Sequence, residues 1–501
     1  SGNMSKKKNS VRSRNISPRK EAFDTAWEKF EPLIPEEELP ALKACIQFTP
    51  DPAIRLNPQK ASISDIGKLR ERYHWDTEPV AFCPDGYKLK DTHEIAPGQT
   101  NEHRCGAFYI QDSASMLPVT LFDREKIQNK PLILDMAASP GGKTTHLSAA
   151  SQDSGLILAN DSSASRITIL KKVMKNWGSI HHLVTVFPGE FFGQWYPNTF
   201  DLVLLDAPCS MQSLVSIASH PMRPISEREE NALAQRQLSL LDSALKAVKP
   251  GGQVVYSTCT LSPAEDELVI NGILKKYGAQ ITLLDAQQKL PYPAPGLVSV
   301  EGSEPNPSLE RTIRLWPHRY QTTGFFAALI QKNDTFGFSE QIEKPFRRSR
   351  EELRFIEIDP RQDHHPIERM NEIFGFNLTE FAEQRECCFR MRGNELWAVP
   401  TVYFDEFVDW PPCKSCGMRI AAQTASGWLP DFDWVSMVFD CITKNHYPLD
   451  ETLTEAWVRG EDLPISLPEY SKGTILFMTD SWNVFIGCGY VSGNRIRNLT
   501  K

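Results

Sequence analysis

Short apolar runs alternate with amphipathic stretches through the middle of the chain. Buried parallel strands are nearly continuous apolar runs, and the helices between them carry one apolar stripe. The order strand–helix–strand therefore predicts a Rossmann-like α/β sheet over residues 105–331. The expected strands are 132–135, 155–161, 183–187, 200–206, 253–259 and 324–331, and the helices between them include 164–175, 227–248 and 263–277.

The pattern is mixed on both sides of this sheet. Residues 21–104 predict a small N-terminal α+β domain, and its strand-like segment 54–60 carries Arg55 and Lys60 as candidate contacts to an RNA backbone. An exposed structural strand would look the same. Residues 366–501 predict a C-terminal α+β region. The remaining segments are polar: 1–20 predicts a disordered basic tail, and 332–365 a linker with arginines at 347, 348, 350 and 354.

Composition narrows the class of protein. The net charge of −8 over 501 residues argues against indiscriminate nucleic-acid binding and leaves that role to local basic clusters. No apolar run reaches the roughly 18 residues that a membrane span needs, so no membrane partner is expected. Eleven cysteines in a chain of this length do not indicate a disulfide framework. We therefore expect a cytoplasmic protein.

The segment 132–147 predicts a strand, a tight loop and a helix N-terminus. Gly141 and Gly142 let a ligand approach their backbone, and the N–H groups at a helix start bind anions. A phosphate loop, and with it a nucleotide-hydrolysing enzyme, is one alternative, but that motif needs glycine where Ala137 stands. Asp161 ends the next strand, where an acid binds ribose hydroxyls. The loop therefore favours S-adenosylmethionine as the cofactor.

Two cysteines follow neighbouring strands of the predicted sheet. Cys209 lies in Asp206-Ala-Pro-Cys209 after one strand, and Cys259 ends the next. Because ligands bind beyond the carboxyl ends of such strands, both thiols should face one pocket. Carbon 5 of a pyrimidine is a poor nucleophile until a thiolate adds to carbon 6, so two thiols and an acid beside a methyl donor suit methylation of that carbon.

These motifs resemble those of the RNA cytosine-C5 methyltransferases of the Nol/Nop/Sun group. The likeness is carried by Asp135–Thr144, Asp206–Cys209, Ser257–Leu261, Gly324–Phe326 and Tyr109–Met116. It implies that Cys259 is the nucleophile, that Cys209 assists product release and that Asp206 touches the target base. It also implies a cofactor site made of Ala137, Ala138, Ser139, Pro140, Gly141, Gly142, Lys143, Asp161, Arg166 and Asp206.

The resemblance further implies the partners of the chain. It is strongest to bacterial members that act on 16S ribosomal RNA, so this RNA or the small ribosomal subunit is the expected substrate, with tRNA as the alternative. The N-terminal domain and a PUA-like C-terminal region are expected to bind RNA, and the chain is expected to be a monomer.

The sequence departs from the family in three places. Pro188-Gly189 replaces an Asp-Gly that contacts the cofactor, Ser210-Met-Gln-Ser213 replaces Ser-Gly-x-Gly, and Ala218–Pro221 replaces a basic-acidic-proline run. These changes motivate a rival hypothesis, an RNA-binding ribosome assembly factor with a decayed catalytic loop. Cys413 and Cys416 have the spacing of zinc ligands but lack a clear second pair, so no metal is assigned.

Overall fold

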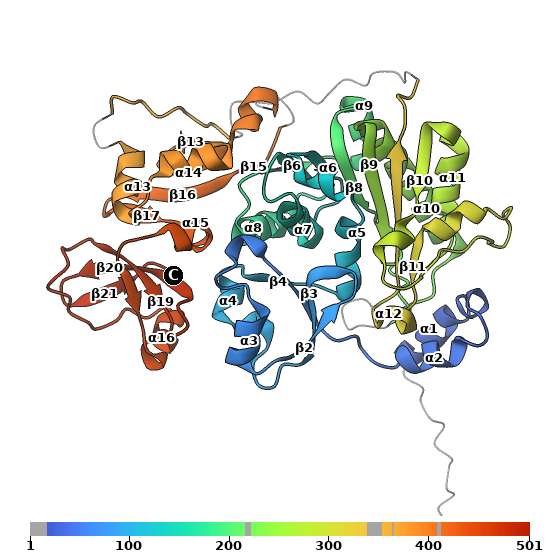
Figure 1. Cartoon of the computed structure of the whole chain (residues 1–501), viewed down its shortest axis with the longest axis horizontal. Helices are drawn as coiled ribbons and strands as arrows, with labels where there is room; N and C mark the ends of the chain where they lie inside the picture. Colours follow the sequence, from blue (N-terminus) through green and yellow to red (C-terminus); the bar gives the residue numbers. More distant parts are fainter. Residues whose placement is uncertain (1–17, 216–221, 338–352, 363–364, 408–411, 501) are drawn as a thin grey trace, which may run out of the picture.

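The computed structural model describes residues 18–215, 222–337, 353–362, 365–407 and 412–500 (Figure 1). Most of the basic tail, the linker arginines at 347, 348 and 350, and the departure at 218–221 lie outside the described residues. The described chain comprises an N-terminal sheet, a large central sheet and two small C-terminal sheets.

The central sheet has nine strands in the order β10-β12-β9-β8-β5-β6-β7-β15, with β11 paired to β12. Pairing is parallel from β9 through β8, β5 and β6 to β7, whereas β12 runs antiparallel to both β9 and β10. The predicted Rossmann-like sheet is therefore confirmed. Its strands are β5 (Leu132–Asp135), β6 (Leu156–Asp161), β7 (His182–Val186), β8 (Phe200–Asp206), β9 (Val248–Thr258), β10 (Ile281–Leu284), β11 (Ile313–Leu315), β12 (Phe325–Lys332) and β15 (Ser415–Cys416).

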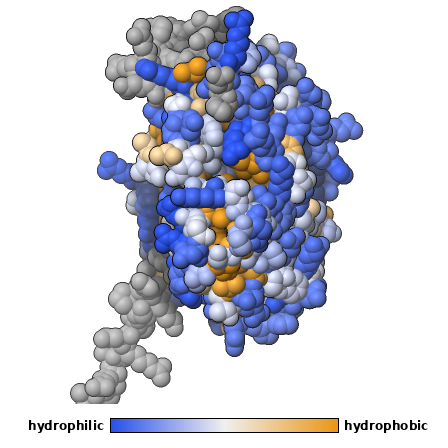
Figure 2. Space-filling model, turned by 90° about the vertical axis from the view of Figure 1, so that its left-hand side faces the viewer, coloured by the Kyte–Doolittle hydropathy of each residue, from blue (hydrophilic) through white to orange (hydrophobic). Residues whose placement is uncertain are grey.

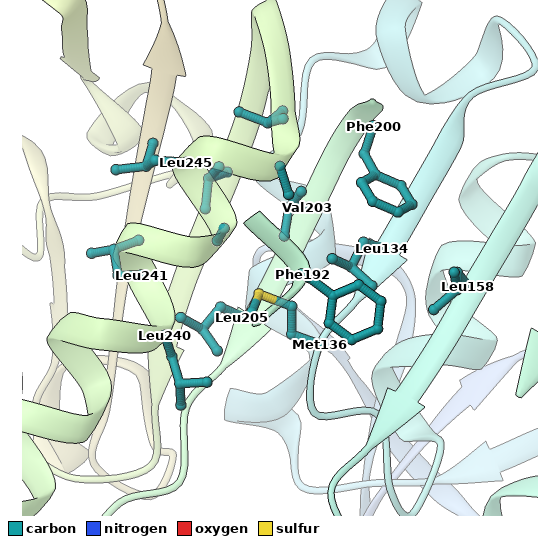
Figure 3. Packing of buried hydrophobic residues seen from close by; sticks show 14 of the residues in the cluster. Leu134, Met136, Leu158, Phe192, Phe200, Val203, Leu205, Leu240, Leu241 and Leu245 are labelled. Atoms are coloured by element: carbon teal, nitrogen blue, oxygen red, sulfur yellow. The ribbon is translucent and has the colours of Figure 1, made fainter. Parts of the chain in front are cut away.

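Two hydrophobic cores cover the faces of this sheet. On one face, side chains of β5 and β8 such as Leu134 and Val203 pack against Leu241 and Leu245 of a long helix, α10 (Figure 3). On the other face, Ile133 and Leu202 pack against Leu170. Successive strand residues thus alternate between the two cores. The helices here are α5 (Leu117–Thr120), α6 (Arg124–Gln128), α7 (Gly142–Ala150), α8 (Ile167–Trp177), α9 (Phe192–Trp195), α10 (Glu227–Ala247), α11 (Glu267–Tyr277) and α12 (Pro317–Tyr320).

The N-terminal part is a four-stranded sheet, β2-β3-β1-β4, with short helices. Strand β4 pairs antiparallel with β1, so the chain enters the central sheet later than the expected boundary at 104. Its elements are α1 (Pro18–Trp27), α2 (Leu39–Cys45), β1 (Ala53–Leu56), α3 (Ile66–Tyr73), β2 (Asp76–Val80), β3 (Cys83–Asp91), α4 (Asn101–Arg104) and β4 (Phe108–Ile110).

The predicted RNA contacts of Arg55 and Lys60 are wrong, because both side chains are buried. The guanidinium of Arg55 donates to Gly142 O at 2.8 Å and to Thr145 Oγ1 at 2.6 Å, both on α7. Lys60 Nζ donates to the carbonyls of Cys105 and Asn176. These two cations fasten the N-terminal sheet to the central domain.

The C-terminal part forms two four-stranded sheets, β13-β14-β16-β17 and β18-β19-β20-β21. It presents a largely hydrophilic face with small hydrophobic patches (Figure 2). Its elements are α13 (Pro366–Phe374), α14 (Leu378–Arg385), β13 (Cys387–Arg392), β14 (Glu395–Pro400), β16 (Met418–Thr424), β17 (Gly427–Pro430), α15 (Phe432–Val438), β18 (His446–Pro448), α16 (Glu451–Val458), β19 (Ile475–Thr479), β20 (Phe485–Ser492) and β21 (Arg495–Asn498).

The short strand β15 joins the C-terminal part to the central sheet, because Ser415 and Cys416 pair with Val184 and Leu183 of β7. Cys413 and Cys416 are buried in the adjoining hydrophobic core. Across the described ranges, no group of three or more potential ligand side chains could hold a metal ion. No helix in those ranges has both the length and the apolar character of a membrane span.

Candidate active site

The site lies where the strand order of the central sheet reverses. Strands β6 and β7 lie on one side of β5, and β8 and β9 lie on the other. Asp135 ends β5 and Asp206 ends the parallel neighbour β8. Open α/β sheets bind ligands in the crevice beyond the carboxyl ends of strands at such a point. The predicted site residues all follow strands at this edge.

The loop Ala137–Gly141 connects β5 to α7. Gly141 has a φ of 120°, a conformation that favours glycine, and it precedes the first residue of the helix. A Cβ on Gly142 would lie 2.9 Å from Cε1 of Tyr109, so the N-terminal sheet closes over the loop. Arg166 donates to the carbonyl of Ser139 at 3.0 Å. The structure therefore gathers the predicted residues 137–143 and Arg166 around one turn.

Asp161 ends β6 beside this loop and is almost fully buried. Its Oδ2 accepts from the N–H of Ser139 at 3.2 Å, and its Oδ1 accepts from the N–H of Ser163 at 3.0 Å. Arg166 Nη1 lies 3.8 Å from Oδ2. The carboxylate thus fixes the shape of the loop as well as facing the site.

Asp135 is a further buried acid that the predicted site omitted. Its Oδ2 accepts from Thr144 Oγ1 at 2.7 Å, and burial raises its pKa to about 7. Within the described residues, its Oδ1 and the Oγ of Ser139 are buried without a hydrogen-bond partner. A buried polar atom without a partner is costly, so both atoms suit a small polar ligand such as the amino-acid end of S-adenosylmethionine. The sequence signal was available, since β5 is an apolar run that ends on an acid.

Cys209 and Cys259 are both half-buried, and their Sγ atoms lie 3.1 Å apart. The hydrogen bond between the thiols, followed by burial, raises the pKa of Cys209 well above its ordinary value, although the N–H of Met211 partly opposes this. The two sulfurs are therefore in direct contact at the ends of neighbouring strands, and either of them can donate the hydrogen bond.

Asp206 lies beside the thiols with its carboxylate partly open to solvent. Its Oδ1 accepts from Ser257 Oγ at 2.8 Å, and Lys143 Nζ donates to its Oδ2 at the same distance. Burial opposes the charge on Lys143, but the nearby Asp206 outweighs it and raises the pKa of the ammonium. Lys143 was expected to contact the cofactor. In the structure it links the first turn of α7, next to the loop Ala137–Gly141, to Asp206.

Comparison with known proteins identifies the chain. Residues 124–331 match the profile described as 16S rRNA methyltransferase RsmB/F, and residues 24–113 match the N-terminal domain of 16S rRNA methyltransferase RsmF. The chain is 30% identical to ribosomal RNA small subunit methyltransferase F of Aeromonas salmonicida, with 89% of each protein covered. It belongs to the RsmB/F family of 16S rRNA methyltransferases.

Other similarities agree with this assignment. The relative of the same name from Serratia proteamaculans is 29% identical, over 89% of this chain and 88% of its own. A crystal structure of a methyltransferase homologue from Pyrococcus horikoshii is 26% identical with a TM-score of 0.54, and it covers 63% of this chain and 100% of its own. As an RsmB/F family protein, the chain is an S-adenosylmethionine-dependent methyltransferase, so the predicted family and cofactor are confirmed.

Buried acids hold the two strand ends in this RsmB/F protein. Glu265 accepts from the N–H of Ser210 at 2.9 Å and from its hydroxyl at 2.5 Å, which fixes the residue after Cys209. Asp266 accepts from Thr258 Oγ1 at 2.6 Å, which fixes the residue before Cys259. Arg314 is fully buried, lies 3.7 Å from Asp266 and forms a closer ion pair with Glu267 at 2.5 Å. None of these side chains was predicted.

The loop after Cys209 keeps an unusual backbone despite its altered sequence. Met211 occupies the first position where the family has glycine, and its φ of 59° is in the left-handed region. Leu214, with a φ of 65°, is fully buried in a cluster with Trp27, Phe30 and Trp316. The N-terminal helices α1 and α2 therefore hold this loop through apolar contacts.

Proposed function

We propose that this RsmB/F family protein methylates carbon 5 of a cytosine in 16S ribosomal RNA through a covalent adduct with Cys259. The 3.1 Å contact between Cys209 and Cys259, beside the cofactor loop, is the observation that carries the proposal. Transfer to an amino nitrogen would need no thiol at all. Carbon-5 methylation needs a thiolate that adds to carbon 6, and a second sulfur beside the first suits the later release of the product.

In the first step, the thiolate of Cys259 adds to carbon 6 of the cytosine. A sulfur–carbon bond forms, and the electron pair of the C5–C6 double bond makes carbon 5 nucleophilic. Negative charge also develops at the third ring nitrogen, where a hydrogen bond donated by the carboxyl group of Asp206 would stabilise it. When bound, S-adenosylmethionine supplies the methyl group that carbon 5 then takes.

The last step reverses the addition. A base removes the proton from carbon 5, the electrons of that bond restore the double bond, and the electron pair of the sulfur–carbon bond returns to Cys259. The hydrogen bond to Cys259 is the largest cause of the raised pKa of Cys209. Formation of the adduct removes this cause, although burial remains, and it leaves the sulfur of Cys209 beside the adduct, where we propose that it assists release of the product.

The altered loop supports an active enzyme over a decayed assembly factor. Met211 keeps the left-handed conformation at a cost of roughly 1–2 kcal/mol for a residue with a side chain. Retention of a strained backbone two residues from Cys209 fits a loop whose geometry is still needed.

Bisulfite sequencing of RNA tests the proposal. Ribosomal RNA from a strain lacking the gene is incubated with S-adenosylmethionine and either the wild-type protein or Cys259→Ser. One new protected cytosine in 16S RNA, dependent on Cys259, is expected. A protected cytosine in tRNA alone would overturn the choice of substrate, and methylation at another atom would overturn the chemistry.

A further inference from the structure

A basic groove lies between α8 of the central domain and the first C-terminal sheet. Its cavity of about 300 Å³ is bordered by Trp397 and by residues of α8, β14, β15 and β16. None of the described residues that line it is acidic. Its cationic residues are Lys171, Lys172, Lys175, Arg392, Lys414 and Arg419.

Acids outside the groove neutralise part of this charge. Asp431 accepts from Lys175 at 2.9 Å and from Arg419 at 2.7 Å, and Glu395 also pairs with Arg419. These pairs build the wall of the groove. Lys172 and Arg392 differ, because no acidic side chain of the described ranges forms an ion pair with either of them. Both cations can therefore take an anion from outside the chain.

An aromatic side chain also borders the groove. The indole of Trp397 is half-buried, and its Nε1 donates to Glu395 Oε2 at 3.0 Å, which fixes the ring. The guanidinium of Arg392 lies 5.6 Å from the ring centroid. A flat apolar surface flanked by cations suits a nucleic acid, whose bases or sugars contact rings while its phosphates contact lysine and arginine.

Helix α8 connects the groove with the edge of the sheet where the candidate site lies. Helix α8 begins immediately after Arg166, which contacts the cofactor loop, and Lys172 follows six residues later. At 1.5 Å per residue, the two positions are roughly 9 Å apart along the helix. Strand β15 fixes the C-terminal part beside this helix through its pairing with β7.

We propose that this groove binds the sugar–phosphate backbone of the RNA substrate away from the target base. The inference deepens the proposed function, since it names where the same RNA is held. Phosphate contacts position an RNA without reading its sequence, so the groove contributes affinity and orientation. Specificity for the target base then comes from the crevice.

The test compares two double charge reversals in the full chain. Lys172→Glu with Arg392→Glu changes the groove. Lys275→Glu with Lys289→Glu changes two exposed lysines elsewhere by the same net charge. Affinity for a 16S RNA fragment is measured by filter binding at several salt concentrations. The groove variant should bind RNA at least about tenfold more weakly. The slope of log affinity against log salt concentration should decrease in magnitude by roughly 1.4, because each lost phosphate contact accounts for about 0.7.

Three controls make the outcome decisive. Lys172→Arg with Arg392→Lys should keep wild-type affinity, and all variants should keep the affinity for S-adenosylmethionine and the melting temperature. An equal loss of RNA affinity in the groove variant and in Lys275→Glu with Lys289→Glu would overturn the proposal. A loss seen only with assembled small subunits, with naked RNA bound normally, would assign the groove to a protein and also overturn it.

These measurements are independent of the site of methylation. If bisulfite sequencing finds no new 5-methylcytosine while the groove variant still loses RNA affinity, the groove proposal stands and the proposed chemistry fails. If the cytosine is methylated and the groove variant binds like the wild type, only the groove proposal fails.

Discussion

Cys209 Sγ lies 3.1 Å from Cys259 Sγ, and this contact is the largest cause of the raised pKa of Cys209. Both thiols follow strands at the same edge of the sheet. The proposed mechanism gives Cys259 the first step and Cys209 the last.

Serine substitutions should separate these two steps. A hydroxyl is far less ionised than a thiol, so Cys259→Ser should lose turnover and form no adduct. Cys209→Ser should still add to RNA and then stall, and denaturing gel electrophoresis should show a protein–RNA adduct. An adduct in Cys259→Ser but not in Cys209→Ser would reverse the assignment. Full activity in both variants would exclude the cysteine mechanism.

Asp161→Ala should weaken binding of S-adenosylmethionine. The carboxylate is expected to accept hydrogen bonds from the ribose, and it also holds the N–H of Ser139. Loss of hydrogen bonds to a charged group costs roughly 1.5–3 kcal/mol, or about 10- to 150-fold in the dissociation constant. Titration calorimetry measures this change, with RNA affinity as the control. An unchanged dissociation constant would remove Asp161 from the cofactor site.

Asp135 should make stability depend on pH. Its pKa rises from 3.8 to about 7 on folding, so the folded chain keeps a proton between these values that the unfolded chain has released. The contribution of Asp135 to the free energy of unfolding is therefore greatest below pH 3.8. It decreases as the pH rises toward about 7 and stays constant above that value. Asp135→Asn has no proton to lose. Relative to this variant, the free energy of unfolding of the wild type should decrease by a few kcal/mol over this pH range, because each pKa unit corresponds to about 1.4 kcal/mol.

Melting temperatures of wild type and Asp135→Asn at several pH values between 5 and 8 measure this effect. The difference between the two proteins should change in favour of the variant up to about pH 7 and then level off. A difference that stays constant over the whole range would show that Asp135 does not titrate there.

Met211→Gly should stabilise the catalytic loop slightly. Glycine removes the roughly 1–2 kcal/mol cost of a left-handed methionine, and the greater freedom of the unfolded glycine offsets about half of it. The melting temperature should stay equal or rise, whereas Met211→Val should lower it because a branched side chain fits this conformation worse. A fall with glycine and a rise with valine would contradict the backbone assigned to Met211.

The sequence predicted the central sheet because buried parallel strands leave a strong apolar pattern. The same pattern located Asp161, Asp206 and both cysteines, since each follows a strand. It failed at Arg55, because a charged residue in a short strand is usually exposed and its partners on α7 lie 87 and 90 residues away. Glu265 likewise supports Ser210 from 55 residues away, and no local pattern marks such a pairing.

Short pairings were also beyond the reach of sequence patterns. Strand β15 has two residues, too few for any periodicity, so the region after 366 looked separate from the catalytic sheet. Strand β4 has three residues and was not predicted as a strand for the same reason.

The pairing of β15 with β7 also covers an edge of the central sheet. Lys414 N–H donates to the carbonyl of Val184 at 2.7 Å, and Gly417 N–H donates to that of His182, so the border of β7 has hydrogen-bond partners from the C-terminal part. A chain cut at 366 would expose those carbonyls and the apolar side chains beneath them as a template for a second molecule. We expect such a fragment to aggregate. The C-terminal part would then prevent self-association at this edge of the sheet, in addition to lining the basic groove.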